Sequence, residues 1–163
     1  HSLNVAMMDA MSLLDPNRYQ VLFMTGKDDL GMVREHAAGH PMGSYVTEFF
    51  DDIAKAYAAT DLIICRAGAS TLAEITAFGL PAILIPYPYA AGGHQEANSR
   101  AMVDAGAAKM ILNSELDGPK LASLIEEIAG NLQLLDSMKE SSRALARPHA
   151  AHEIVDLLLE TVS

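Results

Sequence analysis

Short runs of apolar residues alternate with segments of helical periodicity along most of this chain, and that alternation limits the folds open to it. Each run is apolar at successive positions, so both faces of the strand need to be covered. Strands of this kind separated by helices predict an α/β fold, a Rossmann-like parallel sheet with helices on both faces. We expect the strands at residues 19–24, 43–49, 61–65, 81–85 and 107–112.

Helices are expected before, between and after these strands. The first is indicated by Leu3, Met7, Met11 and Leu14, which recur at the spacing of one helix face. Glycine is typical just past a helix end, and Gly79 and Gly106 stand at two such places. The other expected helices cover residues 28–38, 51–58, 71–78 and 94–105, a segment around 121–128, and two more of which the last spans about 148–159.

Length and composition predict one domain, residues 1–163, and exclude some classes of partner. The chain has 11 basic and 21 acidic residues, a net charge of −10. That balance argues against a nucleic-acid partner and against direct membrane binding by this domain, since both need clustered cations. Cys65 is the only cysteine, so no internal disulfide forms and a cytoplasmic setting is favoured. No apolar run reaches the length of a membrane span.

The segment 65–74, CRAGASTLAE, joins a strand to a helix and is the first candidate site. In a parallel sheet, ligands bind outside the carboxyl ends of the strands. Free N–H groups at a helix start attract phosphate, and Arg66 offers a charged donor beside them. A purely structural interpretation stays open, because Thr71-x-x-Glu74 also matches a capping box that satisfies the helix start by itself.

The segment 86–98, PYPYAAGGHQEAN, is the second candidate site. Its paired glycines suggest a mobile lid. Gln95 and Asn98 lie three residues apart on one helix face, beside His94, and amide side chains suit sugar hydroxyls because they donate and accept. The alternative is a solvated helix start without a ligand.

Other polar residues indicate no further chemistry. His36 and His40 lack a third ligand nearby, so we expect no metal site. Cys65 ends an apolar strand and is expected in the core. The sequence shows no Ser-His-Asp arrangement and no pair of carboxylates like the catalytic pair of glycosidases. No catalytic residue is therefore assigned to this chain.

Three motifs in order resemble the MurG family of bacterial N-acetylglucosaminyltransferases. They are DLIICRAGASTLAE at 61–74, GLPAILIP at 79–86 and HQ-x-x-N at 94–98, and the segments 46–53 and 146–150 resemble that family too. The resemblance spans nearly the whole chain. It implies the two-domain GT-B architecture, with this chain as the carboxyl-terminal half that binds the donor, UDP-N-acetylglucosamine.

The resemblance also implies roles for individual residues. Phe50 lies where backbone groups contact uracil, and Glu74 accepts hydrogen bonds from the ribose. Gln95 reads hydroxyls of the sugar, with Asn98 nearby. The start of a helix faces the diphosphate, so the implied donor-binding set also includes Arg66, Gly68, Ala69, Ser70, Thr71, Leu72 and His94.

The implied reaction is hexosyl transfer in peptidoglycan synthesis with inversion, from the donor to a lipid-linked muramoyl-pentapeptide, on the cytoplasmic face of the plasma membrane. It implies no metal and no cofactor. The family's first strand with its Gly-rich loop, its acceptor domain and its presumed base have no counterpart here, so we expect exposed sheet edges and no transfer by this chain alone. The alternatives are a donor-binding subunit of another GT-B N-acetylglucosaminyltransferase and a non-catalytic nucleotide-sugar module.

Overall fold

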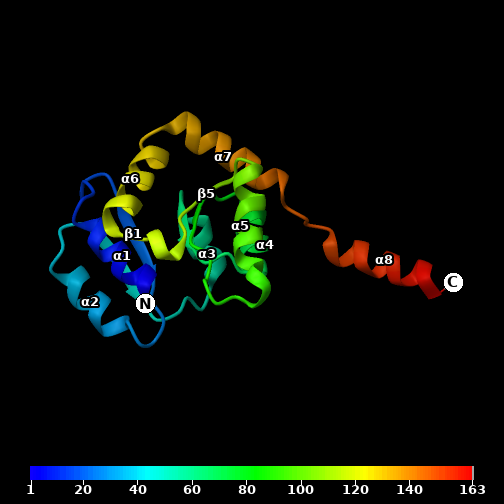
Figure 1. Cartoon of the computed structure of the whole chain (residues 1–163), viewed down its shortest axis with the longest axis horizontal. Helices are drawn as coiled ribbons and strands as arrows, with labels where there is room; N and C mark the ends of the chain where they lie inside the picture. The colour runs from blue at the N-terminus through cyan, green and yellow to red at the C-terminus, as the bar shows by residue number, and fades with distance from the viewer. Residues whose placement is uncertain (163) are drawn as a thin grey trace.

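The computed structural model describes residues 1–162 and contains five short strands that alternate with helices (Figure 1). The strands are β1 (Gln20–Met24), β2 (Gly43–Thr47), β3 (Ile63–Cys65), β4 (Ala82–Leu84) and β5 (Ala108–Met110). The α-helices are α1 (Ser2–Met11), α2 (Leu30–Ala38), α3 (Ile53–Ala58), α4 (Ala69–Phe78), α5 (His94–Asp104), α6 (Gly118–Ala129), α7 (Leu132–Ala144) and α8 (Ala150–Val162). Two 3-10 turns, Ala91–Gly93 and Asn113–Glu115, precede α5 and α6.

All the strand pairs are parallel, as predicted, but they form two sheets. One sheet has the order β1-β2 and the other the order β3-β4-β5. Within residues 1–162, no backbone ladder connects β1 to β3. Each of these two strands is therefore hydrogen-bonded along one edge, and the other edge is open. These two sheet edges are thus unpaired, and their exposure to solvent stays a prediction.

The side chains of β4 and of Ile85, just after it, pack on both faces of the larger sheet. Ile83 and Ile85 belong to one buried cluster, whereas Ala82 and Leu84 belong to the other. The first cluster is covered by α1, α6 and α7 and the second by α3, α4 and α5. Helices therefore cover both faces, and the predicted Rossmann-like α/β fold is confirmed. Since side chains alternate along a strand, the run of apolar residues in β4 serves both faces.

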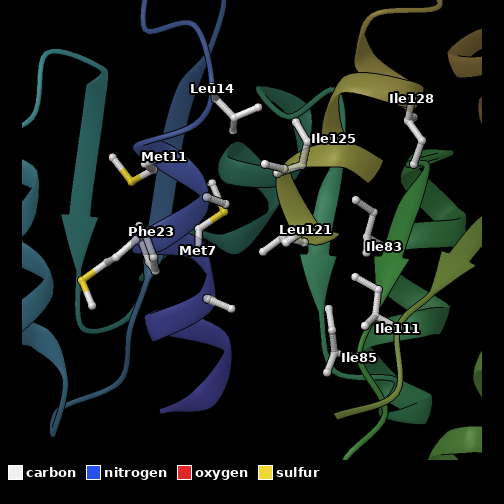
Figure 2. Packing of buried hydrophobic residues seen from close by; sticks show 14 of the residues in the cluster. Met7, Met11, Leu14, Phe23, Ile83, Ile85, Ile111, Leu121, Ile125 and Ile128 are labelled. Carbon is white, nitrogen blue, oxygen red and sulfur yellow. The ribbon is translucent and has the colours of Figure 1, made fainter. Parts of the chain in front are cut away.

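Helices α1 and α6 hold the two sheets together. They pack against each other, and Figure 2 shows Met7 of α1 on the side that faces Leu121 and Ile125 of α6, whereas Met11 points to the other side of α1. The cluster they share includes Phe23 of β1 as well as residues of β4. Apolar burial across the break between β1 and β3 replaces the missing ladder as the link between the sheets.

Helix α8 projects away from the rest of the chain (Figure 1). Its apolar side chains are exposed, among them Ile154, Leu157 and Leu158. Along residues 1–162, no helix combines the length and the apolar character that crossing a membrane requires.

Substitution of Ile83 tests the importance of β4. The side chain of Ile83 is fully buried, so Ile83→Ala removes packing and leaves a cavity. We expect the free energy of unfolding to fall by about 2–5 kcal/mol, measured by urea denaturation. The control is Leu13→Ala, at a position that is 58% exposed, with an expected change within about 0.5 kcal/mol. Equal losses in the two variants would contradict the assigned role of β4.

Candidate functional site

The turn from β3 into α4 leaves the start of the helix without a capping side chain. Helix α4 begins at Ala69, and its N-cap is Gly68 in an extended conformation. Glycine has no side chain to accept from the first turn. Because the helix begins at Ala69, Thr71 is its third residue, the position where a capping box needs glutamate or glutamine. The capping-box interpretation of Thr71 and Glu74 is wrong, and the first N–H groups remain available to an anion.

The residues of this turn lie at the surface, where a ligand can reach them. Ala69 and Ser70 are exposed, and Gly68, Thr71 and Leu72 are half-buried. The dipole of α4 adds about half a positive charge at this end of the helix. The turn is thus an accessible, weakly positive position at the carboxyl end of β3.

Arg66 connects this turn to the neighbouring strand. One guanidinium nitrogen donates to the carbonyls of Ile85 and Pro86, at 3.1 and 3.2 Å, and the other donates to the hydroxyl of Ser2 at 3.0 Å. The guanidinium also lies 5.7 Å from the ring centre of Tyr87. Burial lowers the pKa of Arg66. Much of its donor capacity is therefore used to hold loops together, beside the start of α4.

Glu74 of α4 is held by a tyrosine from α3. The hydroxyl of Tyr57 donates to Oε2 of Glu74 at 2.8 Å. Glu74 is exposed, whereas Tyr57 is buried with its ring 5.5 Å from that of Phe78. Burial, followed by the contact with Glu74, raises the pKa of the Tyr57 hydroxyl well above its ordinary value. Tyr57 thus stays a hydrogen-bond donor.

Two amide side chains of α5 are anchored to the loops around them. Oε1 of Gln95 accepts from the backbone N–H of Tyr87 at 2.9 Å, and Nδ2 of Asn98 donates to the carbonyl of Ala67 at 3.1 Å. His94 is exposed and lies with Nδ1 2.6 Å from the carbonyl of Ala91. Gln95 keeps its amide N–H groups for another partner, and Asn98 keeps its oxygen.

Phe50 belongs to the other sheet. It follows β2, and its ring stacks on Tyr45 with 6.0 Å between ring centres. Helix α3 begins just after it, at Ile53, and contacts α4. The connection between Phe50 and the rest of the predicted site therefore passes through α3, whose Tyr57 contacts Glu74.

A cavity of about 230 Å³ opens beside α5 at this edge of the larger sheet. Its lining includes Tyr87, Gly93, Glu96 and Asn113, but neither Glu74 nor the residues that start α4. Arg66, the start of α4 and the amides of α5 thus lie along the edge where β3 and β4 end, and this cavity reaches only the side next to α5.

Sequence reasoning missed three contributors to this edge. Tyr57 holds Glu74, Ser2 accepts from Arg66, and the backbone of Tyr87 fixes Gln95. Each contact joins segments that are separate in sequence, so no local motif could indicate it. The apolar surroundings of Tyr57 in the α3 segment were the available hint, since a buried tyrosine hydroxyl usually finds a partner.

Residues 1–154 match the glycosyltransferase family 28 C-terminal domain. The chain belongs to this family. Among curated relatives, the N-acetylglucosamine transferase named for UDP-N-acetylglucosamine and N-acetylmuramyl-(pentapeptide) pyrophosphoryl-undecaprenol is 43% identical in Myxococcus xanthus, over 97% of this chain. The same-named protein of Thermodesulfovibrio yellowstonii is 40% identical over 95% of it. The chain spans 42% and 43% of the length of these two relatives.

Solved structures agree with the family assignment. The crystal structure of Acinetobacter baumannii MurG superimposes with a TM-score of 0.89 at 34% identity, covering 98% of this chain and 46% of that one. The S. aureus MnaA–UDP structure gives a TM-score of 0.73 at 16% identity, covering 99% of this chain and 42% of the other. At that identity the second likeness shows the fold alone. Both support the GT-B type of α/β domain.

Cys65, at the carboxyl end of β3, is half-buried and packs against the edge of a buried cluster, whereas the sequence predicted a core position. We predict that its thiol is unreactive in the native protein. Burial raises the pKa of its thiol to about 12, because desolvation disfavours the thiolate. The thiolate is the reactive form, so at pH 8 we expect reaction with a disulfide reagent at least about a hundredfold slower than for glutathione. Unfolding in guanidinium should restore the ordinary rate. A native thiol that reacts as fast as glutathione would contradict this.

Proposed function

We propose that this chain is the donor-binding domain of an inverting N-acetylglucosaminyltransferase of peptidoglycan synthesis, and that its ligand is UDP-N-acetylglucosamine. The observation that carries the proposal is the 43% identity, over 97% of this chain, to a relative named for that transfer. The geometry at the carboxyl ends of β3 and β4 offers suitable groups for each part of such a donor.

The diphosphate of the donor is assigned to the start of α4. The uncapped turn at Gly68–Thr71 presents backbone N–H groups and the positive end of a helix dipole. Arg66 lies beside this turn, held by the carbonyls of Ile85 and Pro86. Charge that develops on the leaving diphosphate is stabilised by donors already in place, and no metal ligand of this chain enters the proposal.

The nucleoside and the sugar are assigned to side chains on either side of that turn. Glu74 accepts from the ribose hydroxyls, through the oxygen that Tyr57 leaves unoccupied. Gln95 donates its amide N–H groups to sugar hydroxyls, and Asn98 offers its oxygen nearby. The backbone around Phe50 takes the uracil. His94 and Leu72 complete the proposed donor-binding set.

The proposed reaction joins this donor to a lipid-linked muramoyl-pentapeptide. The 4-hydroxyl of the acceptor attacks the anomeric carbon, the bond from that carbon to the diphosphate breaks, and UDP leaves from the opposite face with inversion. The proton of the hydroxyl passes to a base that we assign to parts of the relatives outside the matched 42%. The acceptor and the contact with the cytoplasmic face of the membrane belong to those parts too. We therefore expect donor binding, but no transfer, from these 163 residues alone.

Ligand-detected NMR of the 163-residue chain tests the donor assignment. UDP, UDP-N-acetylglucosamine and UDP-glucose are compared, with ADP as the control nucleotide. We expect binding of UDP and UDP-N-acetylglucosamine, weaker binding of UDP-glucose, and none of ADP at the same concentration. Absence of UDP binding would overturn the proposal, and equal responses to UDP and ADP would overturn the uridine assignment.

Removal of the Glu74 carboxylate tests the ribose assignment. Loss of a charged hydrogen-bond partner typically costs about 1–3 kcal/mol, so Glu74→Ala is expected to weaken UDP binding by that amount in calorimetry. The control is Glu115→Ala, because Glu115 is an exposed glutamate in the turn before α6. Equal UDP affinities for Glu74→Ala and the parent chain would refute the assignment.

A further inference from the structure

Tyr57 belongs to none of the sequence motifs, but it connects a buried apolar cluster to a proposed ligand-binding residue, Glu74. Tyr57 is only 8% exposed and belongs to the apolar cluster formed by α3, α4, β4 and α5. Its hydroxyl nevertheless reaches the exposed residue Glu74 and donates to Oε2 at 2.8 Å in a partly buried contact. One end of this side chain is therefore fixed by packing, and the other end contacts a proposed ligand-binding group.

Because packing restricts the Tyr57 side chain, its hydrogen bond limits the rotamers that Glu74 can adopt. A solvent-exposed glutamate on a helix populates several rotamers, because nothing fixes its three side-chain torsions. Packing against Phe78 at 5.5 Å and burial within the cluster restrict the Tyr57 ring. A restricted donor selects the Glu74 rotamers in which Oε2 reaches the hydroxyl, and the position of Oε1 is limited as a result.

We propose that Tyr57 is a positioning residue of the donor site, which aims the second carboxylate oxygen of Glu74 at the ribose hydroxyls of a uridine diphosphate. The inference rests on the proposed function, because it takes Glu74 as the ribose contact. Tyr57 itself touches no part of the ligand. Its effect is to hold Glu74 in the binding geometry before the nucleotide arrives, which lowers the ordering cost of binding.

The decisive experiment compares two nucleotides that differ only in the group Glu74 is meant to bind. Affinities of the 163-residue chain for UDP and for 2′,3′-dideoxy-UDP are measured by calorimetry. Tyr57→Phe keeps the ring and removes the hydroxyl, so we expect about 3- to 10-fold weaker binding of UDP and unchanged binding of the dideoxy nucleotide. A merely structural role of Tyr57 would weaken both nucleotides alike.

Two matched variants separate the hydroxyl contact from general effects. Tyr19→Phe removes the hydroxyl of a tyrosine directly before β1, in the other sheet. Phe78→Leu removes the ring that packs against Tyr57 but leaves the Tyr57 hydroxyl. Tyr19→Phe should leave the preference for UDP over the dideoxy nucleotide unchanged, and Phe78→Leu should lower it less than Tyr57→Phe does. A loss of preference in Tyr19→Phe as large as in Tyr57→Phe would overturn the inference.

A variant on the exposed side of the contact covers the case in which Tyr57→Phe does not fold. Glu74→Asp keeps the carboxylate but is too short to hold the same contact with Tyr57, and we expect a similar loss of preference. Where Tyr57→Phe does fold, adding it to Glu74→Asp should cause no further loss, since the contact is already broken. A further loss of the UDP preference in the double variant would contradict the inference.

The outcomes distinguish the inference from the proposed function. If Glu74→Ala leaves the preference for UDP intact, the ribose assignment fails and the role of Tyr57 fails with it. If Glu74→Ala abolishes the preference but both Tyr57→Phe and Glu74→Asp retain it, the ribose assignment stands and the positioning role is wrong. Loss of preference in Glu74→Ala, Tyr57→Phe and Glu74→Asp together supports both.

Discussion

The burial of β4 on both faces is the constraint on which the rest of the structure depends. Its side chains enter two separate clusters, and its backbone pairs in parallel with β3 on one edge and β5 on the other. Parallel pairing brings the carboxyl ends of the three strands to one edge of the sheet. The loop after β3 and the loop after β4 therefore meet, and Arg66 can donate to the carbonyls of Ile85 and Pro86.

Most of the fold could be predicted from the sequence because each element carries a local signal. The apolar runs predicted all five strands, with ends within two residues of those observed. Gly79 closes α4 in the left-handed conformation that glycine favours at a helix end. The sequence predicted one parallel sheet with exposed edges, but not its division into a two-stranded and a three-stranded sheet. Strand pairing depends on which edges meet in space, and a hydrophobic pattern within one strand does not encode its neighbour.

The candidate site was predictable where it lies within one segment and not where it joins segments. The turn before α4 and the amides of α5 carry recognisable spacings. The capping box failed because the helix starts at Ala69, two residues before Thr71, and the spacing of Thr71 and Glu74 does not reveal that start. The contact between Tyr57 and Glu74 joins α3 to α4 across 17 positions. It depends on how two helices pack, so only the structure could show it.

The polar side chains along this edge share an arrangement that bears on how a ligand is bound. Glu74 uses one oxygen for Tyr57, Gln95 uses its oxygen for the backbone of Tyr87, and Asn98 uses its nitrogen for the backbone of Ala67. Each side chain is thus held through one polar atom and presents the other. A ligand that binds these second atoms meets groups whose rotamers are already restricted, so less conformational entropy is lost on binding. If the proposed donor site is correct, affinity at this edge depends in part on residues that do not contact the ligand.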